Sequence, residues 1–155
     1  MAGCNKPTPI VDIAIALLRN AAGHFYIQRR AETAHQGNRW EFPGGKVEAG
    51  ETTDAALIRE VAEECGVSVC QATLWRRIEH DYGDTKVRLH LYLVDGYAGQ
   101  PASREGLVWR WCCAQALLQL DWPAANRQFI HELALIEDDP QSTEPGSGSG
   151  FAEEA

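Results

Sequence analysis

Residues 45–67 read Gly-Lys-Val-Glu-Ala-Gly-Glu-Thr-Thr-Asp-Ala-Ala-Leu-Ile-Arg-Glu-Val-Ala-Glu-Glu-Cys-Gly-Val, and this stretch predicts a loop followed by a helix. Thr52 or Thr53 suits the N-cap of that helix, Asp54 suits its first turn, and Gly66 suits its end. A helix of about three turns fits between these signals. At about 100° per residue, its apolar side chains form one stripe: Leu57, Ile58, Val61 and Cys65.

Three glutamates border this apolar stripe. Glu60, Glu63 and Glu64 have the spacing i, i+3 and i+4, so their carboxylates should converge. Like charges at this spacing destabilise an isolated helix by about 0.2–0.5 kcal/mol per pair, and a bound cation would offset the repulsion. Carboxylate oxygens suit a hard ion such as Mg²⁺, which usually combines carboxylates with waters and substrate phosphates. A face that is simply solvated is the alternative interpretation.

The residues before the helix favour the metal-binding interpretation. Glu41-Phe42-Pro43-Gly44-Gly45 contains paired glycines, which let a backbone turn sharply and approach a ligand closely. The backbone carbonyl of Gly45 is therefore a further candidate metal ligand. Arg59 should lie on a different side of the helix from the glutamates, where we expect it to pair with Glu51 and fix the loop. An ordinary exposed arginine is the alternative.

The composition indicates one small globular domain, which we assign to residues 1–137. The chain has 155 residues, of which 45% are hydrophobic, enough to fill a core. Residues 138–155 are rich in Gly, Ser, Pro and Glu, which predicts a disordered tail. With 14 basic and 22 acidic residues, the formal net charge is −8, which argues against polymeric nucleic acid as a partner.

The cysteine pattern bears on the cellular compartment. The five cysteines, at positions 4, 65, 70, 112 and 113, are odd in number and include no Cys-x-x-Cys pair. This pattern argues against a disulfide framework and a zinc site, and favours a reducing compartment. The apolar run at residues 10–18 is interrupted by Asp12 and is too short to span a bilayer. We therefore expect a cytoplasmic protein without a membrane partner. We also expect a monomer, although no feature of the sequence determines the oligomeric state.

Hydrophobic alternation and turn signals predict several strands and a second helix. Strands are expected near residues 10–18, 25–28, 74–80, 86–94 and 107–112, with hairpin turns at 20–23 and 83–84. Polar and apolar side chains alternate in 86–94, which predicts a strand with one buried side. A helix is expected from about residue 124 to 136, with this buried stripe: Phe129, Ile130, Leu133 and Ile136. Two helices on a mixed sheet make an α/β sandwich.

Residues 45–67 also fill every fixed position of the Nudix box, Gx5Ex7REUxEExGU with U an apolar residue, so the chain resembles the Nudix hydrolase superfamily. The resemblance implies the Nudix fold, a mixed β-sheet between helices in an α/β/α sandwich. It also implies hydrolysis that depends on Mg²⁺, for which Mn²⁺ can substitute. Glu60 is the preferred candidate for the general base or a bridging ligand. The implied metal ligands are the carbonyl of Gly45 and the carboxylates of Glu60, Glu63, Glu64 and Glu105.

Three stretches, 27–35, 40–52 and 121–126, resemble the MutT branch of that superfamily, which hydrolyses 8-oxo-dGTP to 8-oxo-dGMP and pyrophosphate by water attack at the β phosphorus. In that branch the asparagine that ends the last stretch hydrogen-bonds the oxidised guanine, and Asn126 has this position. An amide offers a donor and an acceptor, which suits the O6 and protonated N7 edge of 8-oxoguanine. Unmodified guanine would leave a polar group of such a site unpaired. A helix cap is the alternative role for Asn126.

The same resemblance implies roles for further residues. Arg30 and His35 would lie at the sugar and phosphate side of the nucleotide. Glu105, which lies beyond the box in the sequence, would supply a further carboxylate to the metal site, provided that its loop reaches the box helix. Phe42 and Tyr82 would line the base pocket. In each case a structural role is the alternative: a solvated arginine, a surface histidine, a turn glutamate or a core aromatic residue.

Other functions stay open because the chain departs from the MutT pattern. Trp122 replaces the usual phenylalanine, and Thr85 stands where the enterobacterial member has an arginine; both bear on substrate choice rather than on hydrolysis. Tyr82 lies 82 − 67 = 15 residues beyond the box, which resembles the enzymes that act on diadenosine polyphosphates. A different Nudix substrate, including CTP or ADP-ribose, is therefore the first alternative. A non-catalytic Nudix module that senses a nucleotide is the second, although such modules tend to lose box glutamates.

Overall fold

The structure is a computed structural model that describes residues 8–34 and 37–136. The predicted tail at 138–155 and the candidate residue His35 lie outside these ranges. The helices and strands, in chain order, are β1 (Ile10–Leu18), β2 (Phe25–Arg29), β3 (Trp40–Glu41), β4 (Gly44–Lys46), α1 (Thr53–Cys65), β5 (Ser68–Asp81), β6 (Lys86–Ala98), β7 (Trp109–Cys112), α2 (Ala114–Leu117) and α3 (Ala124–Ile136).

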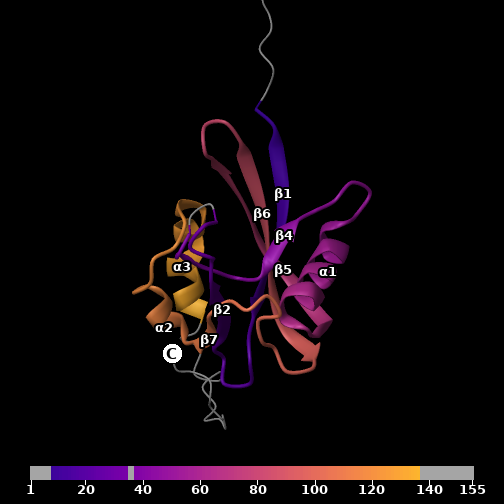
Figure 1. Cartoon of the computed structure of the whole chain (residues 1–155), viewed down its shortest axis with the longest axis vertical. Coiled ribbons are helices and arrows are strands. Elements are labelled where there is room, and N and C mark those ends of the chain that lie inside the picture. The colour runs from indigo at the N-terminus through magenta and orange to yellow at the C-terminus, as the bar shows by residue number, and fades with distance from the viewer. Residues whose placement is uncertain (1–7, 35–36, 137–155) are drawn as a thin grey trace, which may run out of the picture.

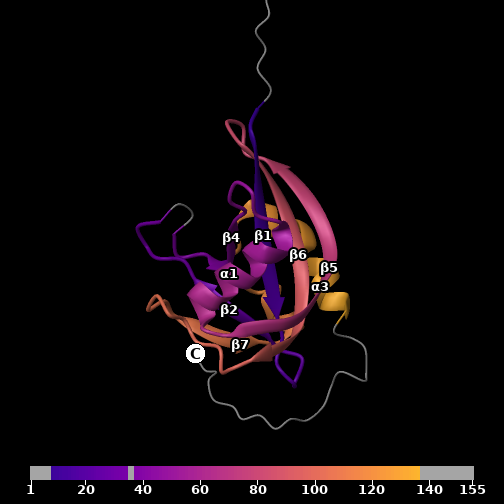
Figure 2. The same ribbon diagram turned by 90° about the vertical axis from the view of Figure 1, so that its right-hand side faces the viewer.

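The strands form two sheets (Figures 1 and 2). The larger sheet has the order β4-β1-β6-β5; β1 is parallel to β6, and the other neighbouring pairs are antiparallel. The smaller sheet has the order β3-β2-β7 and is antiparallel. The predicted α/β architecture with a mixed sheet is confirmed, and a second, smaller sheet accompanies it.

Most strand predictions agree with the structure, but two strands carry no sequence signal. β1 has the predicted bounds, whereas β5 begins at Ser68 and β6 continues to Ala98. β3 and β4 contain only two and three residues, too few to show an alternation of apolar side chains. β4 is a strand because it pairs with β1, where Gly44 lies opposite Ile15.

β6 is buried on both sides, which corrects the prediction of one buried side. Leu89 and Leu91 belong to the core cluster that α2 and α3 complete, whereas Tyr92 and Val94 belong to the cluster that α1 completes. Figure 1 shows α1 on one side of the larger sheet and α2 with α3 on the other. The alternation of β6 is real, since successive side chains point to opposite faces, but a helix layer covers each face. The buried His90 is satisfied by Asp12, whose Oδ1 lies 2.9 Å from Nε2.

Local capping signals determine both ends of α1. The side chain of Thr52 accepts a hydrogen bond from the backbone N–H of Ala55 at 3.0 Å, so Thr52 rather than Thr53 is the cap. Gly66 ends the helix with φ 75° and donates its backbone N–H to a carbonyl in the last turn. The prediction that Ile58 is buried is wrong, because it is 47% exposed. The buried residues of α1 are Ala56, Leu57, Val61 and Cys65.

α3 has the predicted bounds and lies against the other core cluster. Phe129, Ile130 and Leu133 are buried, and Ile136 is partly buried against them. Within residues 8–34 and 37–136, no helix is long and apolar enough to cross a membrane.

Candidate active site

Close packing of β4 against α1 brings the glycine pair and the box glutamates together. A Cβ on Gly45 would overlap the carboxylate of Glu60, so a larger residue would displace that side chain. A Cβ on Gly44 would overlap the backbone carbonyl of Ala14 on β1. The Gly44 position therefore requires glycine because the backbone of β1 approaches it closely, whereas at Gly45 the close neighbour is the end of the Glu60 side chain. Gly45 lies next to the Glu60 carboxylate, and the predicted metal site requires these two residues to be close.

Glu64 accepts hydrogen bonds from a neighbouring strand and from the glycine pair. Its Oε1 accepts from Nε2 of Gln28 at 3.1 Å and from the backbone N–H of Gly44 at 3.4 Å. Burial raises the pKa of Glu64 to about 9, and a hydrogen bond to Glu60 and the charge of Glu41 add to the effect. A partly buried carboxylate close to other carboxylates favours a proton or a cation at this position.

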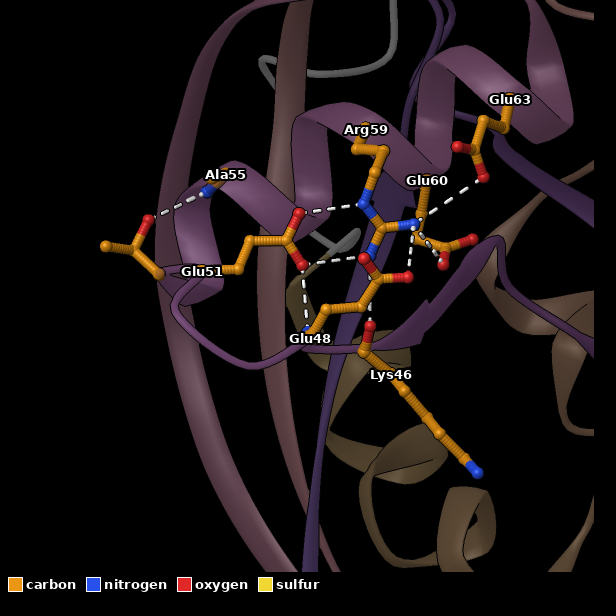
Figure 3. Close-up of polar contacts among 8 residues, drawn as sticks. Lys46, Glu48, Glu51, Ala55, Arg59, Glu60 and Glu63 are labelled. Carbon is orange, nitrogen blue, oxygen red and sulfur yellow. Dashed lines mark hydrogen bonds and ion pairs between the residues drawn. The ribbon is translucent and has the colours of Figure 1, made fainter.

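Arg59 links the loop before α1 to the glutamates (Figure 3). Its Nε and NH2 donate to the two oxygens of Glu51 at 2.7 and 2.9 Å, and NH2 also donates to the carbonyl of Lys46 at 3.1 Å. The predicted Arg59–Glu51 pair is confirmed, and these hydrogen bonds lower the pKa of Glu51 to about 2. The prediction that Arg59 lies away from the glutamates is wrong, because NH1 lies 2.9 Å from Glu60 and 3.5 Å from Glu63.

The loop that carries Glu105 reaches α1, as its predicted role requires. The backbone N–H of Arg104 donates to the carbonyl of Glu64 at 2.8 Å, and that of Ala102 donates to the carbonyl of Cys65 at 3.2 Å. These bonds satisfy carbonyls in the last turn of α1, which have no partner within the helix. The charge of Glu105 also contributes to the raised pKa of Glu64. The loop therefore adds a carboxylate near the end of the box helix.

Two residues without a predicted role, Gln28 and Glu41, lie beside the box glutamates. They face each other across β2 and β3, and Nε2 of Gln28 donates to Oε2 of Glu41 at 2.8 Å. Arg30 donates from NH1 to the other oxygen of Glu41 at 2.6 Å, so this candidate phosphate-side residue lies next to the carboxylates. A polar Gln28 at the end of the apolar run Phe25–Ile27 is the sequence signal that could have found this cluster.

Asn126 lies inside the first turn of α3 rather than at its N-cap. The helix begins at Ala124, and the backbone N–H of Asn126 donates to the carbonyl of Pro123 at 2.9 Å. Asn126 is 9% exposed, and its side-chain amide has no hydrogen-bond partner among the described residues. The amide therefore does not cap the helix, and its donor and acceptor are available for a ligand.

Phe42 is part of the aromatic core next to the segment that carries Asn126. Its ring stacks on Trp122 at a centroid distance of 4.9 Å and contacts Phe25 and Phe129 at 6.2 and 6.0 Å. Only 4% of Phe42 is exposed, so little of its ring is open to a ligand. The indole N–H of Trp122 donates to a backbone carbonyl at 2.9 Å, which explains how a tryptophan is accommodated here in place of phenylalanine.

Tyr82 lies in the turn between β5 and β6 and is 39% exposed. Its ring meets the ring of His80 edge-on at a centroid distance of 4.4 Å. Nδ1 of His80 lies 2.7 Å from Nε2 of Gln128, which connects the end of β5 to α3 two residues beyond Asn126. Tyr82 is therefore connected through His80 and Gln128 to the helix turn that carries Asn126.

The donor set of the box suits a hard divalent cation, because the carboxylates and the Gly45 carbonyl supply oxygen alone. Among the described residues, no group of three or more His, Cys, Asp or Glu side chains is already arranged to hold a metal ion. These carboxylates already have partners in the protein: Arg59 pairs with Glu60 and Glu63, and Glu64 accepts from Gln28. A bound cation would compete with Arg59 for the carboxylates of Glu60 and Glu63.

The fold and the complete box define a Nudix protein, and the chain belongs to the Nudix domain family, whose model matches residues 14–132. The chain is 37% identical over 126 residues to the 8-oxo-dGTP diphosphatase of Escherichia coli (strain K12). The aligned region covers 81% of this chain and 98% of that protein. It is 38% identical over 124 residues to the 8-oxo-dGTP diphosphatase of Haemophilus influenzae. That alignment covers 80% of this chain and 91% of the relative. A solved structure from a study of MutT from Aliivibrio salmonicida and Vibrio cholerae is 30% identical, covers 82% of this chain and 98% of that chain, and has a TM-score of 0.74. The predicted resemblance is confirmed.

Proposed function

We propose that the protein hydrolyses 8-oxo-dGTP to 8-oxo-dGMP and pyrophosphate and so removes an oxidised nucleotide from the nucleotide pool. The observation that carries this proposal is the 37% identity to the E. coli 8-oxo-dGTP diphosphatase over 98% of that protein. The amide of Asn126, which has no partner within residues 8–34 and 37–136, supports the same substrate, because a nearly buried donor and acceptor suit the O6 and N7–H edge of the oxidised base.

The metal in this proposal is Mg²⁺, with Mn²⁺ as a substitute. Its ligands would be the carbonyl of Gly45 and the carboxylates of Glu60, Glu63, Glu64 and Glu105. When bound, the ion neutralises charge on the phosphate oxygens and lowers the pKa of the attacking water. Burial raises the pKa of Glu64 most, and the neighbouring carboxylates raise it further; those carboxylates support this assignment, since a cation would relieve their repulsion.

The side chains have separate roles in the proposed reaction. Glu60, whose carboxylate lies beside Gly45, is the preferred group to accept the proton of the water that attacks the β phosphorus or to bridge the metal ions. Arg59 holds Glu51 and the Lys46 carbonyl, which keeps the loop before α1 in place. Arg30 contributes positive charge on the phosphate side, next to Glu41. His35, which lies outside the described residues, is proposed for the same side.

Base recognition is assigned to Asn126, with Tyr82 at the rim of the pocket and Phe42 beneath it. Phe42 acts through its stack on Trp122 rather than by a broad contact with the base, since its ring is almost fully buried. Unmodified guanine presents an acceptor at N7, so the donor or the acceptor of the Asn126 amide would be left without a partner. Sites that depend on such hydrogen bonds can discriminate strongly between related substrates.

We also propose a monomeric cytoplasmic enzyme that acts on free nucleotides rather than on nucleic acid polymers. The net charge of −8 supports the exclusion of polymers, because a negative surface repels a phosphate backbone. Sedimentation equilibrium of the full chain tests the oligomeric state, and a mass of twice 17.1 kDa would contradict it.

A nucleotide panel tests the proposed function. Hydrolysis of 8-oxo-dGTP, dGTP, CTP, ADP-ribose and diadenosine tetraphosphate is measured with Mg²⁺ and ranked by kcat/KM. We expect 8-oxo-dGTP to rank first, with release of pyrophosphate, and EDTA to abolish turnover. A different substrate in first place would replace the proposal by another Nudix activity. Absence of hydrolysis for every nucleotide would favour a non-catalytic nucleotide sensor.

A further inference from the structure

Gln28 is a buried polar residue to which neither the Nudix box nor the base pocket assigns a role. It lies on β2, is 1% exposed, and uses both N–H groups of its amide. Nε2 donates to Oε2 of Glu41 at 2.8 Å and to Oε1 of Glu64 at 3.1 Å. Its Oε1 accepts from the hydroxyl of Tyr26 at 3.1 Å. The orientation of the amide is therefore determined, because a flipped amide would point its oxygen at two carboxylates.

These contacts connect elements that are distant in the sequence. Glu41 faces Gln28 across the small sheet, whereas Glu64 lies on α1, 36 residues from Gln28. The other oxygen of Glu41 is taken by NH1 of Arg30 at 2.6 Å. A continuous chain of hydrogen bonds thus runs from Arg30 through Glu41 and Gln28 to Glu64.

We propose that Gln28 is a positioning residue, which orients the Glu64 carboxylate for the metal and holds it next to Glu41. This inference rests on the proposed function, because it assigns Glu64 to the metal site. Gln28 binds one oxygen of Glu64, Oε1, and so determines where the other oxygen, Oε2, can lie. The amide also places two donor hydrogens between two carboxylates that would otherwise repel each other.

The alternative is that Gln28 only fills space in the core. An apolar side chain of similar length, such as methionine, would fill that space equally well but would leave Glu41 and Glu64 without these donors. Residues that orient metal ligands typically change metal affinity or activity by about 10- to 100-fold when they are replaced. A space-filling residue would change stability without a comparable change in metal affinity.

The test compares Gln28→Met with Tyr26→Phe. The second variant removes the hydroxyl that binds the amide oxygen but leaves both carboxylate contacts and the stack of the Tyr26 ring on Trp109, whose centroid lies 5.3 Å away. Mn²⁺ affinity is measured without nucleotide by electron paramagnetic resonance of the free ion. Thermal unfolding is measured alongside, and kcat and KM are measured with 8-oxo-dGTP.

We expect Gln28→Met to weaken Mn²⁺ binding and to lower kcat by about 10- to 100-fold, with little change in KM. Tyr26→Phe should leave Mn²⁺ affinity within about threefold of the native value. In a Glu64→Gln background, Gln28→Met should have little further effect on Mn²⁺ affinity, because the residue acts through Glu64. If Gln28→Met does not fold, Gln28→Leu takes its place in all measurements.

Two results would overturn the inference. Native Mn²⁺ affinity in Gln28→Met, whatever its stability, would leave Gln28 as a packing residue. Equal additional losses with and without Glu64 would show that it does not act through that carboxylate. Because Mn²⁺ binding is measured without nucleotide, these results are independent of which substrate the enzyme prefers. A native protein that binds no Mn²⁺ would overturn the metal assignment and this inference together.

Discussion

Arg59 and Glu51 form a bidentate ion pair, with Nε–Oε2 at 2.7 Å and NH2–Oε1 at 2.9 Å. The pair joins the loop before α1 to the side of the helix that carries the glutamates. NH2 also donates to the carbonyl of Lys46 at the end of β4, so one guanidinium fixes the strand, the loop and the helix together (Figure 3). Because NH1 lies 2.9 Å from Glu60, the same side chain also holds the preferred catalytic carboxylate.

Arg59→Lys should lower kcat by about 100-fold, because an ammonium cannot reproduce the planar fork and small displacements of catalytic groups cost rate. Steady-state kinetics with 8-oxo-dGTP provide the measurement. Arg76→Lys is the matched control, since Arg76 pairs with Glu132 at 3.0 Å on the exposed surface. A similar loss in both variants would mean that the Arg59 network has no special relation to the reaction.

Glu60→Gln should lower kcat by about 10²- to 10⁴-fold, because it removes a carboxylate that is proposed to accept a proton and to bind the metal. The protein should stay folded, since the amide has nearly the same size and an oxygen that can still accept from Arg59. Kinetics and circular dichroism measure the two properties. Glu132→Gln, a change on the outer part of α3, provides the control. Turnover near the native value in Glu60→Gln would remove Glu60 from the proposed mechanism.

The predictions that succeeded depend on local signals. The ends of α1 follow from Thr52 and Gly66, which act within one turn of the chain. Glu51 and Arg59 are eight residues apart, close enough for the loop and helix to suggest their pairing.

The predictions that failed depend on tertiary packing. Ile58 lies next to the apolar stripe of α1, and only the position of the sheet determines that Ala56 is buried instead. β6 alternates as a half-buried strand would, but a second helix layer covers its polar face. The contact between Gln28 and Glu64 joins residues that only the folded chain brings together. No periodicity in the sequence encodes it.

Glu64 should make the stability of the metal-free protein depend on pH. Burial among carboxylates raises its pKa from 4.5 to about 9, so between these values the folded chain binds a proton that the unfolded chain has lost. The free energy of unfolding therefore falls as pH rises through this window. Thermal unfolding of protein dialysed against EDTA should show a steeper decrease from about pH 5 to pH 9 in the native protein than in Glu64→Gln.

Addition of Mg²⁺ should reverse this dependence, because the ion replaces the proton on the carboxylates. The increase in unfolding temperature caused by Mg²⁺ should therefore grow with pH in the native protein. Parallel pH profiles for native protein and Glu64→Gln would show that Glu64 does not titrate in this window.

Asn126→Ala should reduce kcat/KM for 8-oxo-dGTP far more than for dGTP. The side chain is almost buried, and its amide is unpaired among the described residues, so its donor and acceptor can serve the base. Loss of a hydrogen bond in such a site typically costs about 1–3 kcal/mol, or about 5- to 150-fold in kcat/KM. Unmodified guanine lacks the proton at N7, so kcat/KM for dGTP should fall less.

Glu132→Gln provides the control for Asn126→Ala, because Glu132 lies on the same helix and pairs with Arg76 at 3.0 Å, away from the residues assigned to base recognition. This variant should change kcat/KM for the two nucleotides in the same proportion. Equal losses on 8-oxo-dGTP and dGTP in Asn126→Ala would mean that the amide supports the pocket without reading the oxidised base. The proposed role of the box glutamates in hydrolysis would stand, because they lie on α1, whereas Asn126 lies on α3 on the other side of the larger sheet.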